Sequence, residues 1–115
     1  MKSSFEGIGQ WAATFACSGD VAEGQVVKVS ANGEVSACSD GEKFCGMAAV
    51  VGRDGAACSV VLGGMVSAAY TGSAPALGWS GLSANGSGGV KANTSGREHL
   101  VVDVDAANMM VTFVL

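Results

Sequence analysis

The sequence predicts an all-β fold, a small single-domain β-barrel or sandwich of short antiparallel strands and glycine-rich hairpins. Ser-Ala-Asn-Gly occurs at 30–33 and again at 83–86, and Asn-Gly is a strong hairpin signal because it accepts the positive φ angles of tight turns. Glycine occurs 18 times and proline once, which suits many short turns. Valine and alanine dominate the apolar 49% of the chain, a composition that favours pleated strands over amphipathic helices.

Strand-like segments and turn signals alternate along the chain, giving about nine or ten short strands, as in a barrel or sandwich. In order, they are 12–17, 26–30, 34–38, 44–51, 57–62, 65–70, the two arms around Leu82 and Val90, 100–104 and 109–115. The clearest alternation places Val66, Ala68 and Tyr70 on one face. Near the end of the chain, Leu100, Val102 and Val104 are expected to share a face, which leaves His99 on the opposite, polar face.

A chain of 115 residues suits one domain, and we divide it into an N-terminal arm, 1–11, and a β-rich domain, 12–115. Phe5, Ile8 and Trp11 are the large apolar residues of the arm. They are expected either to fold back on the core or to dock on a partner.

The net charge is −4 and no lysine or arginine cluster occurs, so binding to nucleic acid lacks its electrostatic driving force. The apolar stretch at 8–16 is interrupted by Gly9 and Gln10, which supports neither a secretion signal nor a membrane span. We therefore expect a soluble protein in the cytoplasm of the cell that makes it.

Four cysteines, Cys17, Cys38, Cys45 and Cys58, form no C-x-x-C pair, and the chain has one histidine. This spacing argues against a zinc site. Free, packed thiols are the favoured prediction, and disulfides remain the alternative.

Residues that could carry chemistry are few, so we expect no enzyme, cofactor or metal site. His99 is the only candidate base, and a lone histidine on a polar strand face is usually solvated. Asp103 and Asp105 could share a cation on one strand face, although a polar face running into a turn explains them as well. A carrier domain with a modified lysine is disfavoured, because Lys28 and Lys91 lie within strands and not at hairpin tips.

Glycine spacing and valine alternation form one extended pattern, carried by the segments 23–29, 32–35, 44–48, 64–68, 70–72, 75–78, 82–84, 89–91, 100–105 and 111–115. This pattern resembles the tailed-phage head decoration proteins, of which the lambda type is the best known, and the resemblance implies a β-clip-like fold of bent β-ribbons. The likeness covers roughly 14–115, with the arm shortened here to about eleven residues.

This resemblance implies a structural virion protein that binds the phage major capsid protein on the outer capsid surface, as a homotrimer or similar homo-oligomer, and bridges capsomers of the expanded shell. Within that hypothesis Phe5, Ile8 and Trp11 are candidates for the shell contact. Trp79, in an expected loop at 78–81, is a candidate for a subunit or capsid contact, or else caps the open end of the barrel. The alternative function is an adhesin-like module that binds a glycan or host surface.

Overall fold

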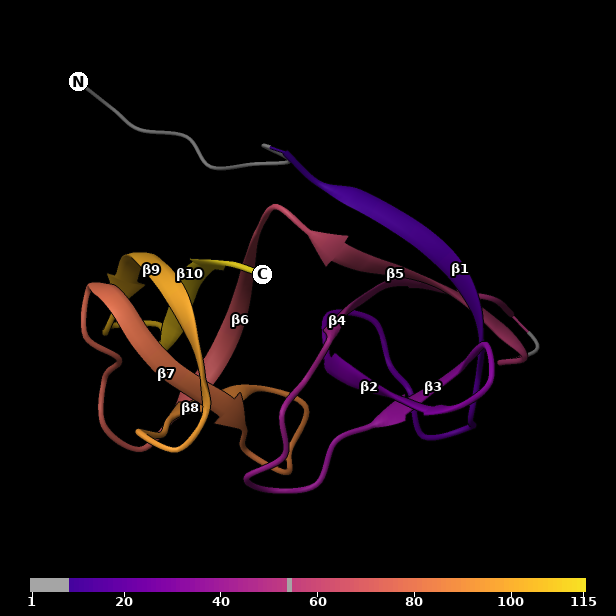
Figure 1. Ribbon diagram of the computed structural model, residues 1–115, viewed down its shortest axis with the longest axis horizontal. Coiled ribbons are helices and arrows are strands. Elements are labelled where there is room, and N and C mark those ends of the chain that lie inside the picture. Colours follow the sequence, from indigo (N-terminus) through magenta and orange to yellow (C-terminus); the bar gives the residue numbers. More distant parts are fainter. Residues whose placement is uncertain (1–8, 54) are drawn as a thin grey trace.

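The computed structural model describes residues 9–53 and 55–115, and these form ten β-strands closed into two five-stranded barrels (Figure 1). The first barrel consists of β1 (Trp11–Cys17), β2 (Val26–Ala31), β3 (Glu34–Ala37), β4 (Gly46–Val51) and β5 (Ala57–Gly63). The second consists of β6 (Met65–Thr71), β7 (Gly78–Ala84), β8 (Val90–Ala92), β9 (Arg97–Asp105) and β10 (Met110–Val114). The all-β prediction is confirmed.

Both barrels have the same strand order, β1-β3-β2-β4-β5 in the first and β6-β8-β7-β9-β10 in the second. Most neighbours are antiparallel, as predicted from the sequence, but β1 pairs with β3 and β6 with β8 in parallel. The parallel pairs arise because the second strand of each hairpin, β3 or β8, lies beside the end of the strand that precedes the hairpin, β1 or β6. This contact closes each barrel.

The strand registers show an internal duplication with a spacing of 53 residues, except for the third strand of each barrel in chain order, where β8 lies 55 residues after β3 because a longer turn precedes it. Phe15 opposite Cys58 in the first barrel corresponds to Ala68 opposite Val111 in the second. The irregularity of β4 after Ala48 likewise recurs in β9, 53 positions later. The two Ser-Ala-Asn-Gly segments are 53 residues apart as well, so the sequence echo marks equivalent turns of two equivalent barrels.

Only the glycine of each Asn-Gly pair adopts a positive φ, +68° at Gly33 and +80° at Gly86. The turns therefore differ from the two-residue type in which both central residues have positive φ. The first hairpin contains a register shift between Val29 and Ala31, as expected when a glycine follows a tight turn. In the second, the Asn85 side chain accepts hydrogen bonds from two backbone N–H groups, of Ser87 and Gly89.

Two clusters of buried side chains form the core. The interior of the first barrel is small and mostly aliphatic: Val21, Val27, Val35, Ala48, Cys58 and Val60. The larger cluster fills the second barrel and also includes residues of the first, namely Val26, Cys38, Phe44, Met47 and Val61. The barrels thus share a continuous apolar contact and form one compact unit.

The alternation predicted for 65–70 is confirmed, with Val66, Ala68 and Tyr70 buried. The alternation predicted for 100–104 is wrong, because the bulge at Val102 changes the register. Val101 is 2% exposed and faces the interior opposite Phe113. One extra residue in a strand moves the following side chains to the other face.

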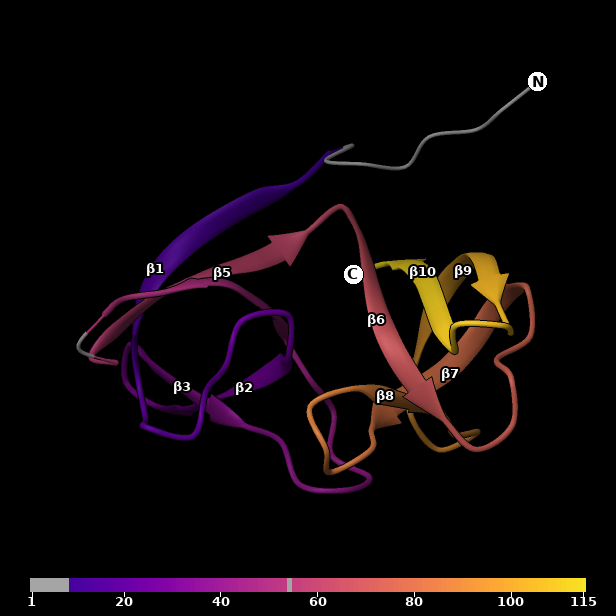
Figure 2. The same cartoon turned by 180° about the vertical axis from the view of Figure 1, so that it is seen from behind.

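The turn from β5 to β6 joins the barrels, and Figure 2 shows β6 running between them. Gly64 has a φ of +90° there, and the backbone of Gly9 and Gln10 lies so close that a Cβ at Gly64 would collide with it. The Gln10 side chain donates to the Met65 carbonyl at 2.7 Å. The described residues include no helix of the length and apolarity needed to cross a bilayer.

Candidate interaction surfaces

Trp79 is a strand residue, not the loop residue expected from the sequence. It is the second residue of β7, opposite Leu100 of β9. Its side chain is 71% exposed, and the neighbouring Leu77 is 68% exposed. A tryptophan that capped the barrel interior would be buried, so this indole is instead presented to solvent by the outer wall of the second barrel.

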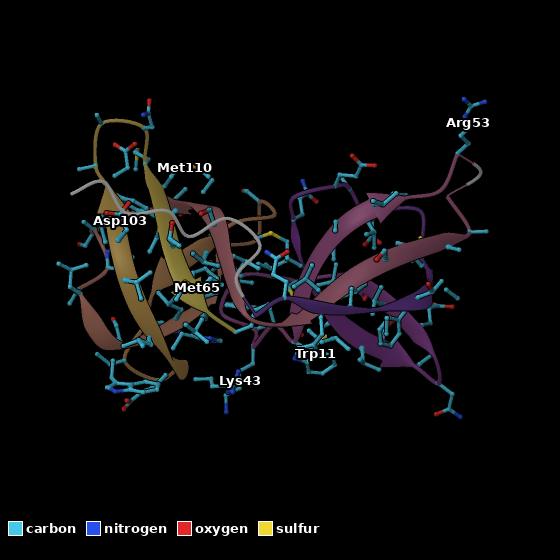
Figure 3. The ribbon with its side chains drawn as sticks, turned by 90° about the horizontal axis from the view of Figure 1, so that it is seen from above. Trp11, Lys43, Arg53, Met65, Asp103 and Met110 are labelled. Carbon is cyan, nitrogen blue, oxygen red and sulfur yellow. The ribbon has the colours of Figure 1, made fainter. Side chains whose placement is uncertain are left out.

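Trp11 is the first residue of β1 and is 60% exposed. Its indole lies on Gly63, where a Cβ would overlap the ring, so the glycine provides the space for the aromatic side chain. Figure 3 shows Trp11 near the middle of the molecule, where the barrels meet, while Arg53 lies at the far end of the first barrel. The two tryptophans therefore mark separate places on the surface.

Within the described part of the chain, one edge of β1 is largely unpaired. β5 pairs with β1 along its length, but β3 pairs only with Ala16 and Cys17. The residues from Trp11 to Thr14 are exposed and carry no charge. An exposed, apolar strand edge can accept a strand from another chain.

Phe5 and Ile8, the other predicted shell contacts, lie outside the described residues. Of the four contact residues predicted from the sequence, the structure therefore describes Trp11 and Trp79, and these two lie in different barrels.

His99 is buried, so the expectation that it would lie on a solvated strand face is wrong. Its ring stacks on Phe44 with centroids 5.0 Å apart and contacts Phe113 edge to face at 5.3 Å. Nδ1 lies 2.9 Å from the Val114 carbonyl, which accepts the bond when this nitrogen carries the proton. Burial lowers the pKa of His99, and the ring serves as an aromatic packing residue.

Asp103 and Asp105 lie at the outer end of the second barrel, where Figure 3 shows Asp103 on the surface. Asp105 accepts hydrogen bonds from the backbone N–H and the side-chain amide of Asn108, and these bonds lower its pKa. Among residues 9–53 and 55–115, no group of three or more His, Cys, Asp or Glu residues could hold a metal ion. The Asp105 carboxylate acts as a turn cap.

Both lysines considered as modification sites form ion pairs. Lys28 contacts the Glu42 carboxylate at 2.7 Å, and Lys91 contacts Asp40 at 2.9 Å. The second pair links β8 to the loop before β4, and therefore links the two barrels. Neither lysine lies at a hairpin tip.

The cysteines are free thiols in the structure. Burial is the main cause that raises the pKa of Cys38 and of Cys58 to about 11 each, and it also raises the pKa of Cys45. A thiol with a raised pKa is a poor nucleophile because the thiolate is the reactive form. These cysteines are packing residues.

Four further exposed apolar residues were not expected from the sequence: Val29, Val50, Leu77 and Met109. Val29 is the informative case, since it shares a strand face with Val27, which is fully buried, yet is itself 55% exposed. Alternation correctly placed both side chains on one face but could not show that the first barrel is open at Val29.

Comparison with known proteins gives no family: no protein-family model and no curated protein matches the chain.

Proposed function

We propose that the chain is a structural virion protein that binds the outer surface of a phage capsid and stabilises the expanded shell by bridging capsomers. It would act as a homotrimer or similar homo-oligomer on the major capsid protein, after synthesis in the host cytoplasm, with no chemical step. The observation that carries the proposal is the exposure of Trp11 and Trp79, 60% and 71%, on strands of two different barrels.

Exposed tryptophans on strands are suited to binding, because a large aromatic side chain loses little conformational freedom when a partner buries it. The strands fix the backbone positions from which both indoles project. Two anchors on two connected barrels can contact two neighbouring molecules, Trp11 a capsid subunit and Trp79 a capsid subunit or a second copy of the chain, and linking the contacts increases the overall affinity. A ligand that binds the assembled shell and not its separated subunits stabilises the shell by mass action.

The open edge of β1 supports the same function. Its uncharged exposed residues lie beside Trp11, so an extended segment of a capsid subunit could pair with the edge while the indole fills a pocket. Backbone pairing supplies affinity that depends little on the sequence of the partner.

Sedimentation with mature, undecorated shells tests the proposal. The purified chain should sediment with shells up to a fixed stoichiometry. Trp11→Ser and Trp79→Ser should each weaken capture by about tenfold or more, the scale of a central aromatic contact. Val50→Ser is the matched control, since Val50 is also exposed on a strand, and it should leave capture unchanged. Absence of the wild-type chain from the shell pellet would contradict the proposal.

The second candidate function is an adhesin-like module for a glycan, because an exposed indole such as Trp79 can also stack on a sugar ring. A glycan array with and without calcium distinguishes the two functions. Saturable, calcium-dependent binding lost in Asp103→Asn would favour the adhesin, whereas shell capture without glycan binding favours the capsid protein.

A further inference from the structure

The contact between the two barrels is asymmetric and uses two different surfaces. The first barrel contributes Val26, Met47 and Val61 from its outer wall, which are at most 8% exposed and belong to the cluster of the second barrel. Val26 also donates its backbone N–H to the Gly88 carbonyl at 2.9 Å. These residues show which wall of a barrel is suited to packing on the next barrel.

The second barrel contributes the end of the β7–β8 hairpin. Leu82 and Ala84 are 0% and 1% exposed and belong to the same cluster. The Ala84 backbone exchanges two hydrogen bonds of 2.9 Å with Gly41 and Glu42 of the first barrel. This end of the barrel is therefore covered by its neighbour.

The duplication gives this outer wall of the first barrel a counterpart on the second barrel. Val26, Met47 and Val61 correspond to Trp79, Leu100 and Val114, each 53 positions later, by the strand registers. We call these three residues the Trp79 face. Trp79 is largely exposed and the other two are partly exposed, so a wall that is buried in the first barrel faces solvent in the second.

The complementary surface is free as well. By the spacing of the Ser-Ala-Asn-Gly repeat, Leu82 and Ala84 correspond to Val29 and Ala31, 53 positions earlier in the β2–β3 hairpin. Val29 is 55% exposed, and Ser30 and Ala31 are exposed. We call Val29, Ser30 and Ala31 the Val29 end, where the apolar side chains of Val29 and Ala31 are exposed.

Each chain thus forms the barrel-to-barrel contact once, between its own two barrels. The counterparts of the two contacting surfaces, the Trp79 face and the Val29 end, are both at least partly exposed. We propose that copies of the chain associate head to tail, with the Trp79 face of one copy packed on the Val29 end of the next. The occupant of each surface is a second copy, because the counterparts of these two surfaces pack on each other within the chain. Repeat proteins behave in this way when a terminal unit lacks a polar cap.

The two contacts differ in the loop between β3 and β4, which in the first barrel also supplies the Gly41 and Glu42 backbone groups that bond Ala84. Phe44, from the loop between β3 and β4, reaches the second barrel and stacks on His99, whereas the shorter connection between β8 and β9 holds no aromatic residue. Trp79 stands where the first barrel has Val26 and Leu77 where it has Gly24. The larger side chains supply the apolar bulk that the loop lacks.

A head-to-tail contact joins unlike surfaces, so it continues from copy to copy and can close into a ring. The ring would contain twice as many barrels as chains. The inference specifies the surfaces of the homo-oligomer in the proposed function, and it is tested without shells, so its failure is distinct from a failure of shell binding.

Complementation between two variants tests the contact. Trp79→Glu removes the Trp79 face and keeps the Val29 end, while Val29→Glu does the reverse. Each variant alone should be monomeric in sedimentation velocity, and an equimolar mixture should form a dimer of one Trp79→Glu and one Val29→Glu chain. Wild-type protein should form larger oligomers, with concentrations up to about 1 mM included so that a contact with a millimolar Kd is populated.

Val50→Glu is the control, because Val50 is exposed on a strand of the first barrel and belongs to neither surface; it should assemble like the wild type. Circular dichroism should confirm that all variants retain the wild-type β spectrum. The proposal is overturned if the wild type stays monomeric throughout this range, if either charged variant assembles like the wild type, or if the mixture of the two remains monomeric.

Discussion

Protonation of His99 should destabilise the folded protein at mildly acidic pH. The ring is 2% exposed, stacks on Phe44 and bonds the Val114 carbonyl. Burial is the largest cause of its lowered pKa, and the nearby Arg97 charge acts in the same direction. The unfolded chain, with a pKa near 6.5 for this group, therefore takes up a proton at a higher pH than the folded chain does.

The sign and size follow from proton linkage. Above pH 6.5 both states hold a neutral ring, and the stabilisation from the buried ring is fully present. Between this value and the lower pKa of the folded state, the free energy of unfolding should fall by up to about 1.4 kcal/mol per pH unit for one proton. The lowered carboxyl pKa values of Asp20, Glu42 and Asp105 act at lower pH, so the range from about pH 5 to 7 reports on the histidine.

Urea unfolding at a series of pH values measures this effect, with His99→Phe as the comparison. Phenylalanine keeps an aromatic ring against Phe44 but cannot donate to the Val114 carbonyl, so the variant should be less stable at neutral pH by about 1 to 3 kcal/mol. Its free energy of unfolding should be flat from about pH 5 to 7, and the two curves should converge as the pH falls. Equal slopes for the two proteins would refute the assignment of the effect to His99.

Three further predictions concern packing. Phe44→Ala removes an aromatic ring that joins the barrels and should reduce the free energy of unfolding by about 3 to 5 kcal/mol in urea titrations. Gly46→Ala should cost at least about 1 to 3 kcal/mol, because its Cβ would overlap neighbouring backbone, whereas the matched Gly19→Ala, with open space around it, should change stability by less than about 0.5 kcal/mol. Cys38 and Cys58 should react with a thiol reagent near pH 8 much more slowly in folded protein than in urea, since each is buried and has a pKa of about 11; equal rates would contradict that burial.

The strands could be predicted from the sequence because turn glycines and alternating valines are local signals. The double barrel could not, since the parallel pairing of β1 with β3 depends on contacts far apart in the chain. His99 was assigned to the wrong environment for a related reason: a bulge at Val102 is invisible to simple alternation, and it reverses which face of β9 is buried. Trp79 is exposed, but the sequence places it in a loop, because its place on a strand depends on pairing with β9.

The duplication also separates residues that form a barrel from residues available for contact. Val60 and its counterpart Phe113 are both fully buried, as expected for positions needed to close each barrel. Val26 and its counterpart Trp79 differ, since one is buried and the other largely exposed. Where two equivalent strand positions differ in exposure, the exposed side chain does not pack in a barrel interior. Such a side chain is therefore available to contact a partner. On this argument the binding that we propose for the chain lies where its two halves differ, and an exposed tryptophan at such a position is the residue to test first.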